Sequence, residues 1–515
     1  MWNPSYIFAA LMACLLGLSS AGAFAGTAEE LLMLLYKKGV ITEEEYKILN
    51  AGHDKQAPAQ AEPKPAAKAA PEAKAEASAP AKDEIVAKFK DGITWESADK
   101  GTVLGINGRI QADFRKFFGA DVLDADTFDV RRAYLGARGK FWNDYEFQVV
   151  GDFGSLSGPT ATVCTNAACT STASVPTSTS SHLDEAYFNI TWWKQARFRF
   201  GQFDMPFSLE TLMSDRFTDF MERSMASTSL AQGKARGAMV YGVPVTGVYY
   251  GLAYSNGQGK NTNDTNQVAD GKQVTGRVAV NWAELFSLRN SVYHVGGAFS
   301  TGKIPASAAP SGRTDARGIT FFAPAPFTGG EVDRTRYGLE TAVAYGPYKL
   351  QAEYVRANFS GTSAGGAGYN KDIRSYYIDL NWLITGEHYA DAYSGGVFGR
   401  IRPKSNFSPS GGGWGAWEAS VRYTKWDASD FSLLAIDSAN PGTGVLIPTS
   451  TFTPTNEAKG YTLGLKWILN PNTRFLLNYT KTDFASPVRI TSSSPSASAT
   501  TGDERAITFR GQFDF

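Results

Sequence analysis

Apolar and polar residues alternate in short segments from residue 103 to the end of the chain. The last segment, Ala506 to Phe515, shows the pattern most clearly, because its odd positions are apolar or glycine and its even positions are mostly polar. A period of two predicts β-strands with one apolar and one polar face. A closed membrane barrel requires such strands, apolar toward lipid and polar toward the interior. The pattern therefore predicts an all-β protein that crosses an outer membrane.

Sixteen such segments are separated by turn residues, and a single-chain bacterial barrel requires an even number. The expected fold class is thus a 16-stranded antiparallel transmembrane β-barrel. Its connections alternate between short turns, which face the periplasm in such barrels, and long polar loops. The strands are expected at Val103–Phe117, Phe128–Phe141, Tyr145–Asp152, Leu183–Trp192, Ala196–Phe203, Ala238–Val243, Val248–Ser255, Thr275–Trp282, Val292–Thr301, Arg334–Tyr345, Tyr348–Phe359, Ser375–Leu383, Ala416–Trp426, Gly460–Leu469, Thr473–Phe484 and Glu504–Phe515.

Aromatic residues collect at the predicted strand ends, where amphipathic rings suit the lipid headgroup level. This girdle argues against a soluble β-sandwich. One periplasmic connection, Thr385 to Gly413, is long and rich in glycine, proline and serine, and the sequence leaves open whether it folds back into the barrel. The girdle residues are Trp142, Trp192, Trp193, Trp282, Tyr345, Tyr348, Trp382 and Trp467.

The residues before the barrel differ in composition. An apolar stretch followed by small residues at Ala23 and Ala25 predicts a secretory signal peptide, while the residues around Cys14 offer a lipoprotein cleavage box as the alternative. Four segments are expected in order: a signal peptide (1–25), a periplasmic helical hairpin or coiled-coil segment (26–50), a linker rich in Ala, Pro, Lys and Glu (51–90) and the transmembrane β-barrel (101–515).

The charge balance narrows the possible partners. The 515 residues include 50 Lys plus Arg and 50 Asp plus Glu, so the formal net charge is zero and a nucleic-acid partner is not expected. Cys164 and Cys169 remain after signal removal, and export to an oxidising compartment favours a disulfide between them. A metal pair with His182 and Asp184 nearby is the alternative. No cofactor is predicted.

Strand parity predicts which side chains face the interior. Placing Phe198 and Phe200 toward lipid directs Arg197 and Arg199 inward, and the other strands follow the same rule. Many inward arginines are matched by inward acids, so anion preference depends on arginines left without an acidic partner. The inward basic residues include Arg109, Arg115, Arg132, Arg138, Arg277, Arg334, Arg336, Arg422 and Arg510, and the inward acidic residues are Asp113, Glu146, Asp152, Glu185, Glu340, Glu353, Asp379 and Glu418.

Seven short phrases occur in order along the barrel region: Phe128–Gly136, Leu183–Tyr187, Gly201–Glu210, Phe220–Ser224, Leu383–Glu387, Gly415–Glu418 and Gly464–Pro471. Together they resemble the phosphate-selective porin O and P family of Gram-negative outer membranes, from Gly105 to Phe515. The resemblance implies a homotrimer of 16-stranded barrels in contact with outer-membrane lipid and lipopolysaccharide. It also implies passage of small anions, phosphate or similar, past a third external loop that folds inward, here Asp204 to Arg236.

The family's anion site is carried over by matching motif to motif. Guanidinium forks offer paired donors to phosphate oxygens, and a ring of arginine excludes cations. Strand parity turns Arg131 away from Arg132, so Arg131 reaches the interior only if a bulge or the strand end reorients it. The resemblance implies an anion site at Arg131, Arg132, Tyr134, Glu185, Arg223, Ser227 and Arg236, with Arg109 a further candidate.

Two other functions stay open. A general or differently selective porin would keep the same barrel, with the helical segment of residues 26–50 as an envelope tether. A barrel hydrolase fits less well, because the four histidines belong to no recognisable catalytic motif, and no enzymatic activity is expected. These histidines are His53, His182, His294 and His388.

Overall fold

The computed structural model describes the barrel region and a short stretch before it. The predicted signal peptide, the helical hairpin and residues 51–84 of the linker lie outside the described residues and stay predictions. Among the described residues, no helix is long and apolar enough to cross a membrane. The described residues are 85–89, 92–118, 126–154, 160–164, 172–176, 183–257, 259–261, 271–306, 308–327, 330–432, 452–490 and 500–515.

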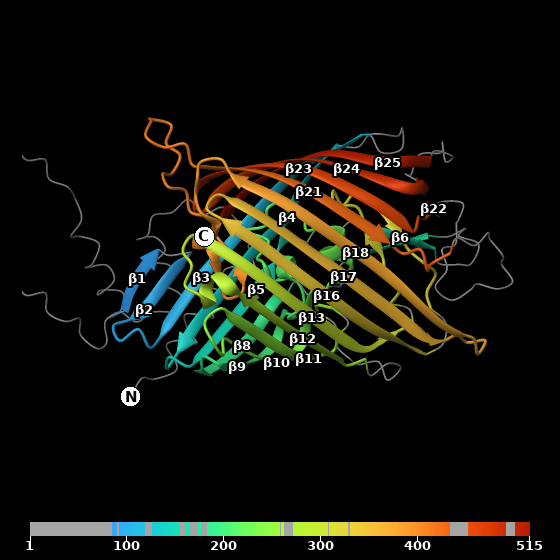
Figure 1. The fold of residues 1–515 in the computed structure, drawn as a ribbon, viewed down its shortest axis with the longest axis horizontal. Helices are drawn as coiled ribbons and strands as arrows, with labels where there is room; N and C mark the ends of the chain where they lie inside the picture. Colours follow the sequence, from blue (N-terminus) through green and yellow to red (C-terminus); the bar gives the residue numbers. More distant parts are fainter. Residues whose placement is uncertain are drawn as a thin grey trace, which may run out of the picture. The chain divides into compact units, whose positions relative to one another are not determined.

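Sixteen antiparallel strands form a sheet that closes on itself, because β25 pairs with β3 along Arg109–Phe118 (Figure 1). The predicted 16-stranded barrel is therefore confirmed. The wall strands are β3 (Val103–Phe118), β4 (Asp126–Phe141), β5 (Tyr145–Asp152), β8 (Leu183–Trp193), β9 (Ala196–Asp204), β10 (Lys234–Gly242), β11 (Val248–Ser255), β12 (Gln273–Asn281), β13 (Ser291–Pro305), β16 (Glu331–Tyr345), β17 (Tyr348–Thr362), β18 (Gly368–Leu383), β21 (Ala416–Asp427), β23 (Glu457–Asn470), β24 (Thr473–Ile490) and β25 (Thr500–Asp514).

Side chains alternate between the two faces as the period of two predicts. On β16, Leu339 and Val343 are exposed on the outer face, whereas Glu340 and Ala342 are buried inside. The tight turn after β4 has positive φ at Trp142 and Asn143, as a type I′ hairpin turn requires. Parity thus directs charged side chains into the interior.

Several strand limits differ from the predicted ones. Strand β10 begins at Lys234, four residues before the predicted start at Ala238. The predicted strand end at Trp282 is wrong, because Trp282 opens the short helix α5 (Trp282–Leu285). The Asn281 side chain caps this helix by accepting a hydrogen bond of 3.1 Å from the Ala283 backbone N–H. Local capping therefore overrides the strand pattern at this turn.

A hairpin of β1 (Ile85–Phe89) and β2 (Ile93–Ser97) precedes the barrel, so the linker predicted to run to residue 90 ends earlier. Strand β2 pairs with the first residues of β3, Val103–Ile106. This edge of β3 is available because β25 pairs with β3 only from Arg109 onward. The backbone N–H and C=O groups that β25 leaves unpaired at the start of β3 therefore pair with β2.

Seven shorter strands and two short helical turns complete the described fold outside the wall. Strand β22 adds to the long-loop end of β24, and the other short strands form separate two-stranded hairpins. The first cysteine of the predicted disulfide, Cys164, ends β6, while Cys169 lies outside the described residues. These elements are β6 (Thr160–Cys164), β7 (Thr172–Pro176), β14 (Gly312–Arg313), β15 (Thr320–Phe322), β19 (Tyr393–Ser394), β20 (Val397–Phe398), β22 (Phe452–Thr453), α4 (Leu209–Leu212) and the 3-10 turn η3 (Tyr389–Ala392).

The loop of residues 205–233, named the inner loop here, folds into the barrel between β9 and β10. It contains α4 and the π-helical turn η2 (Ala226–Leu230). On β17, the Glu353 carboxylate accepts hydrogen bonds from the backbone N–H groups of Leu209 (3.1 Å) and Glu210 (2.6 Å). These are orphan donors at the start of α4, so the wall residue satisfies them.

The interior is not polar throughout, which differs from the simple parity expectation. At the long-loop end, inward residues of the wall strands such as Phe359 and Trp426 are fully buried and apolar. They pack against Phe207 and Leu230 of the inner loop and against Phe322 of the loop after β13. Because these loops fold inward and displace water, the wall facing them is apolar.

A buried ion pair gives the first prediction. Arg422 on β21 is 2% exposed and bridges Asp379, at 2.7 Å, and Glu210 of the inner loop. Arg422→Gln leaves two carboxylates without their cation, so the free energy of unfolding should fall by about 3–5 kcal/mol. A guanidinium titration in detergent measures this.

The matched control is Arg356→Gln, which breaks an ion pair whose arginine is 44% exposed. Exposed pairs contribute about 1 kcal/mol or less. Equal losses in the two variants would contradict the anchoring role of Arg422.

Candidate functional site

A cavity of about 530 Å³ lies between the inner loop, the wall strands β3 to β10 and the connection between β18 and β21. Its lining carries more basic than acidic side chains, so its local charge is positive although the chain is neutral. The basic side chains are Arg109, Arg138, Arg216, Arg223, Lys234, Arg400 and Arg402, and the acidic ones are Asp184, Glu185, Asp204, Asp215 and Asp391.

Carboxylates hold the inner loop against cations of the wall. Glu222 accepts from Arg115 (2.8 Å) and Arg131 (2.9 Å) and lies 3.2 Å from Arg510. Asp219 pairs with Lys349 at 2.7 Å. Burial alone would raise the pKa of the Glu222 carboxyl, but the surrounding guanidinium groups outweigh burial and hold that pKa well below its ordinary value.

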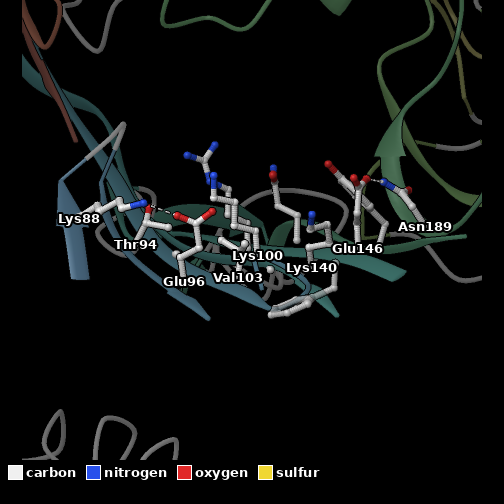
Figure 2. Close-up of a pocket in the computed structure, with 14 residues that line it drawn as sticks. Lys88, Thr94, Glu96, Lys100, Val103, Lys140, Glu146 and Asn189 are labelled. Carbon is white, nitrogen blue, oxygen red and sulfur yellow. Dashed lines mark hydrogen bonds and ion pairs between the residues drawn. The ribbon is translucent and has the colours of Figure 1, made fainter. Parts of the chain in front are cut away.

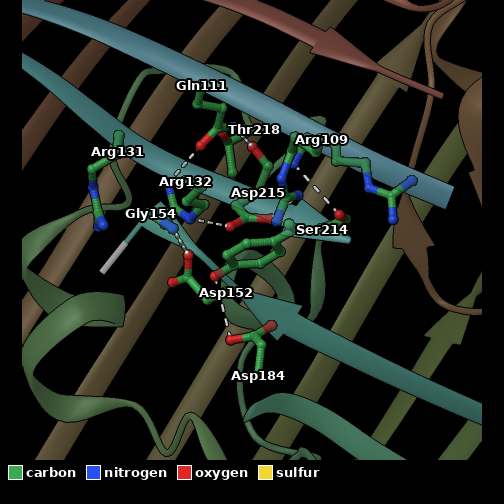
Figure 3. A network of polar contacts seen from close by, with 12 residues as sticks. Arg109, Gln111, Arg131, Arg132, Asp152, Gly154, Asp184, Ser214, Asp215 and Thr218 are labelled. Carbon is green, nitrogen blue, oxygen red and sulfur yellow. Dashed lines mark hydrogen bonds and ion pairs between the residues drawn. The ribbon is translucent and has the colours of Figure 1, made fainter. Parts of the chain in front are cut away.

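Three predicted site residues come together around Asp215 of the inner loop (Figure 3). Arg132 reaches its carboxylate at 2.5 Å, and Arg109 donates to the other oxygen. The Arg109 guanidinium lies 4.3 Å from the centre of the Tyr134 ring, and the Tyr134 hydroxyl donates to Asp184 at 3.3 Å. Burial would raise the pKa of Asp215, yet the two guanidinium groups hold it well below the ordinary value.

Arg131 reaches the interior through a β-bulge. Gln111 pairs with Arg132 and the next residue of β3, Ala112, pairs with Val130, so Arg131 has no partner in the register. The extra residue turns its side chain toward Glu222. Arg131 was expected to face the interior only if a bulge or the strand end reoriented it, and the bulge does so.

Two other predicted site residues lie further along the same side of the wall, on β8 and β10. Glu185 on β8 lies 3.3 Å from Lys234 and accepts a hydrogen bond from Gln148. Arg236 belongs to β10 rather than to the loop, and its Nε donates to Gln202 at 3.3 Å. Arg236 is not among the residues that line the cavity.

The remaining two predicted site residues serve the inner loop itself. Arg223 donates to the backbone carbonyls of Glu210 (2.9 Å), Thr211 (3.2 Å) and Met213 (2.7 Å), which ties the loop together although its side chain borders the cavity. Ser227 is 4% exposed and does not border the cavity. Of the eight predicted residues, four line the cavity, namely Arg109, Tyr134, Glu185 and Arg223. Arg132 binds the cavity residue Asp215, while Arg131, Ser227 and Arg236 do not line the cavity.

Sequence reasoning missed the basic groups of the connection between β18 and β21. This connection folds inward, because Tyr389 and Phe398 are buried and pack in one cluster with Leu209 of the inner loop. It brings Arg400 and Arg402 to the cavity. Arg400 also pairs with Asp514 of β25 at 2.5 Å. Two arginines in a glycine-rich connection gave no periodic signal that could have assigned them to the interior.

Arg216 of the inner loop differs from the other arginines. Its guanidinium makes no hydrogen bond or ion pair with any described residue, and its buried Nε is unsatisfied. Burial, with the charges of Arg109 and Arg400, lowers the pKa of this guanidinium and outweighs the opposite effect of Asp514 and Asp215. Arg216 thus meets the condition stated for anion preference, an arginine that forms no ion pair with an acidic residue of the described chain.

A second cavity of about 600 Å³ adjoins the first, because Arg138, Gln148 and Tyr187 line both. Figure 2 shows other residues of its lining, among them Lys140, Glu146 and Asn189. Lys88 of β1 and Lys140 of β4 border it, and Lys88 pairs with Glu96 of β2 at 2.6 Å. The hairpin before the barrel thereby extends the polar lining beyond the wall. Among the described residues, no three His, Cys, Asp or Glu side chains are grouped to hold a metal ion.

A closed 16-stranded barrel with an inward loop and arginine-lined polar cavities is the architecture of an outer-membrane porin. The chain belongs to the phosphate-selective porin O and P family, whose model matches residues 104–515. This confirms the family resemblance, and the members of the family are channels rather than enzymes.

Comparison with individual proteins gives more distant matches. Porin O of Pseudomonas aeruginosa is 26% identical over 417 residues, which cover 76% of this chain and 85% of that protein. An anion-selective porin from Comamonas acidovorans is 14% identical with a TM-score of 0.47, covering 80% of this chain and 100% of the other. The outer membrane channel DcaP of Acinetobacter baumannii is 10% identical with a TM-score of 0.46, covering 81% and 98%.

The depressed pKa values of Asp215 and Glu222 give the second prediction. Their stabilising contribution is present above the ordinary carboxyl pKa and is lost only as the pH falls through the lower folded-state pKa. The inner loop should therefore stay anchored from pH 7 to about pH 4, where free carboxyl groups protonate. Hydrogen exchange of residues 214–224, corrected for intrinsic rates, measures this, and loss of protection near pH 5 or 6 would contradict it.

Proposed function

We propose that this porin forms a water-filled channel for the passive diffusion of small anions, phosphate or related oxyanions, through the arginine-lined constriction. The excess of basic side chains around the 530 Å³ cavity carries the proposal. Guanidinium groups repel cations and offer paired donors to oxyanions. Phosphate is the solute favoured here because of the family and because an oxyanion matches these paired donors.

The functional unit that we propose is a homotrimer in the outer membrane, with lipid and lipopolysaccharide around it. The family resemblance and the apolar outer face of the wall support this assignment. Exposed residues of that face include Leu252, Val278, Leu339, Val343 and Leu463.

A differently selective porin is the second candidate, and a specific observation favours it. The central arginines Arg109, Arg131 and Arg132 each pair with a carboxylate of the inner loop. Paired guanidinium groups contribute little net charge to the channel. Selectivity then depends on residues such as Arg216, and a weak anion preference without an oxyanion site would follow.

Neutralising Arg216 gives the third prediction. In planar bilayers with a KCl gradient, the wild-type reversal potential should report anion preference. Arg216→Gln should lower the anion-to-cation permeability ratio by a factor of about 5, the effect of losing roughly 1 kcal/mol of charge interaction. Arg356→Gln, which removes an exposed arginine outside the cavity, is the control. An equal permeability ratio in Arg216→Gln and wild type would show that Arg216 does not contribute to the anion preference.

The fourth prediction concerns the solute. Inorganic phosphate added to one side should block the chloride current, because it competes for the same guanidinium groups. Arg132→Ala removes a charged donor and should weaken this block about tenfold or more. Arg236→Ala should have the smaller effect, because Arg236 donates to Gln202, whereas Arg132 binds the cavity residue Asp215. Block that is absent in the wild type would favour the differently selective porin.

A further inference from the structure

Two guanidinium groups from neighbouring strands converge on one carboxylate of the inner loop. Arg109 on β3 and Arg132 on β4 each bind a different oxygen of Asp215, and Figure 3 shows the carboxylate between them. The side chains of Arg109 and Arg132 are 4% and 10% exposed, so both cations are largely withdrawn from water. A carboxylate and a phosphate accept the same paired donors. Asp215 therefore occupies the place that an oxyanion would take.

The donors are held in place without help from Asp215. Arg132 also donates to the Gln111 side chain at 2.8 Å, and Gln111 in turn donates to Gln512 at 2.8 Å. The Arg109 guanidinium packs 4.3 Å from the centre of the Tyr134 ring. Hydrogen bonds and ring contact thus preorganise the pair of cations for an anion.

The Asp215 carboxylate differs from the other anchors of the inner loop. The side chains of Glu210, Asp219 and Glu222 are 3%, 6% and 7% exposed, whereas that of Asp215 is 18% exposed and borders the 530 Å³ cavity. An anion in the cavity can therefore approach this carboxylate more readily than the buried anchors.

The loop backbone at this point has separate attachments. Gln111 donates to the Asp215 carbonyl at 3.1 Å, and Gln512 donates to the Arg216 carbonyl at 3.1 Å. The loop can keep its position while the Asp215 side chain moves aside. The backbone of the loop is therefore anchored independently of the bonds between the Asp215 carboxylate and the two arginines.

We propose that Asp215 is a tethered competitor for the anion that the channel passes. A mobile oxyanion has to displace the carboxylate from Arg109 and Arg132, and the carboxylate returns when the oxyanion leaves. A tethered group competes at an effective concentration in the millimolar range, which weakens binding without changing the donors. Rapid conduction requires such weak binding. The inference rests on the proposed function, since it assumes that anions enter the cavity.

The test replaces the competitor by a neutral side chain of the same shape. In Asp215→Asn, phosphate no longer competes with a carboxylate, so the dissociation constant for phosphate block of the chloride current should fall at least about tenfold. The residence time of each blocking event should lengthen as well. Asp215→Ala, which retains the backbone acceptor, should tighten the block in the same direction and serves if the asparagine variant does not assemble.

The matched control is Asp391→Asn. Asp391 lines the same cavity from the connection between β18 and β21, but it does not bind Arg109 or Arg132. This variant makes the same change in charge and should alter the block by no more than about threefold, as expected for a distant charge in water. Equal tightening in the Asp215 and Asp391 variants would overturn the inference, because charge alone would then explain both.

The double variant Arg132→Ala with Asp215→Asn tests whether the tighter phosphate block depends on Arg132. The tighter block should largely disappear, since one of the two donors is gone. A gain that persists in the double variant would place the phosphate elsewhere and overturn the inference. A wild-type channel that prefers cations would instead reject the proposed function, a result that the reversal potential gives independently of any block.

Discussion

Pairing between carboxylates of the inner loop and cations of the wall is the constraint on which the rest of the interior depends. A buried charge without a partner costs several kcal/mol, so neither partner is stable in this position alone. Strand parity fixes the guanidinium groups of Arg422 and Arg510 inside the barrel, and Glu210 and Glu222 of the loop meet them there. The loop therefore folds inward because its buried carboxylates require the cations of the wall, whereas Arg422 and Arg510 also have wall partners in Asp379 and Asp113.

The same pairing limits what the channel can do with its arginines. A guanidinium bound to Asp215 or Glu222 has much of its charge balanced by that carboxylate. An arginine-rich interior is therefore not in itself a strongly anion-attracting one. Among the described arginines that line the cavity, Arg216 of the inner loop makes no ion pair, so its positive charge stays available.

The features that could be predicted from the sequence are those that follow from the alternation of residues along a strand. Parity placed Arg109 and Arg132 inside because a strand alternates its faces wherever it lies. It could not place Arg400, since a connection without periodicity carries no signal for which side of the barrel it enters. Arg131 depended on a bulge, which is decided by pairing with β3 and not by the sequence of β4 alone. The carboxylate partners were also beyond reach, because they belong to a loop whose path only the closed barrel defines.

Apolar packing inside the barrel determines where water-filled space remains. Trp426 and Phe359 on the wall pack against the inner loop and the loop after β13, which excludes water from the long-loop end of β16 to β24. Hydrophobic contact thus holds the inner loop against this part of the wall. Its acidic residues pair with cations on the same strands, Lys349 on β17 and Arg422 on β21, and with arginines of β3, β4 and β25. The polar cavities consequently lie along β3 to β10, where arginines and tyrosines line them. Hydrophobic packing at the long-loop end and ion pairing along the wall together confine the polar space to these cavities, so the Asp215 carboxylate lies between that space and the guanidinium groups of Arg109 and Arg132.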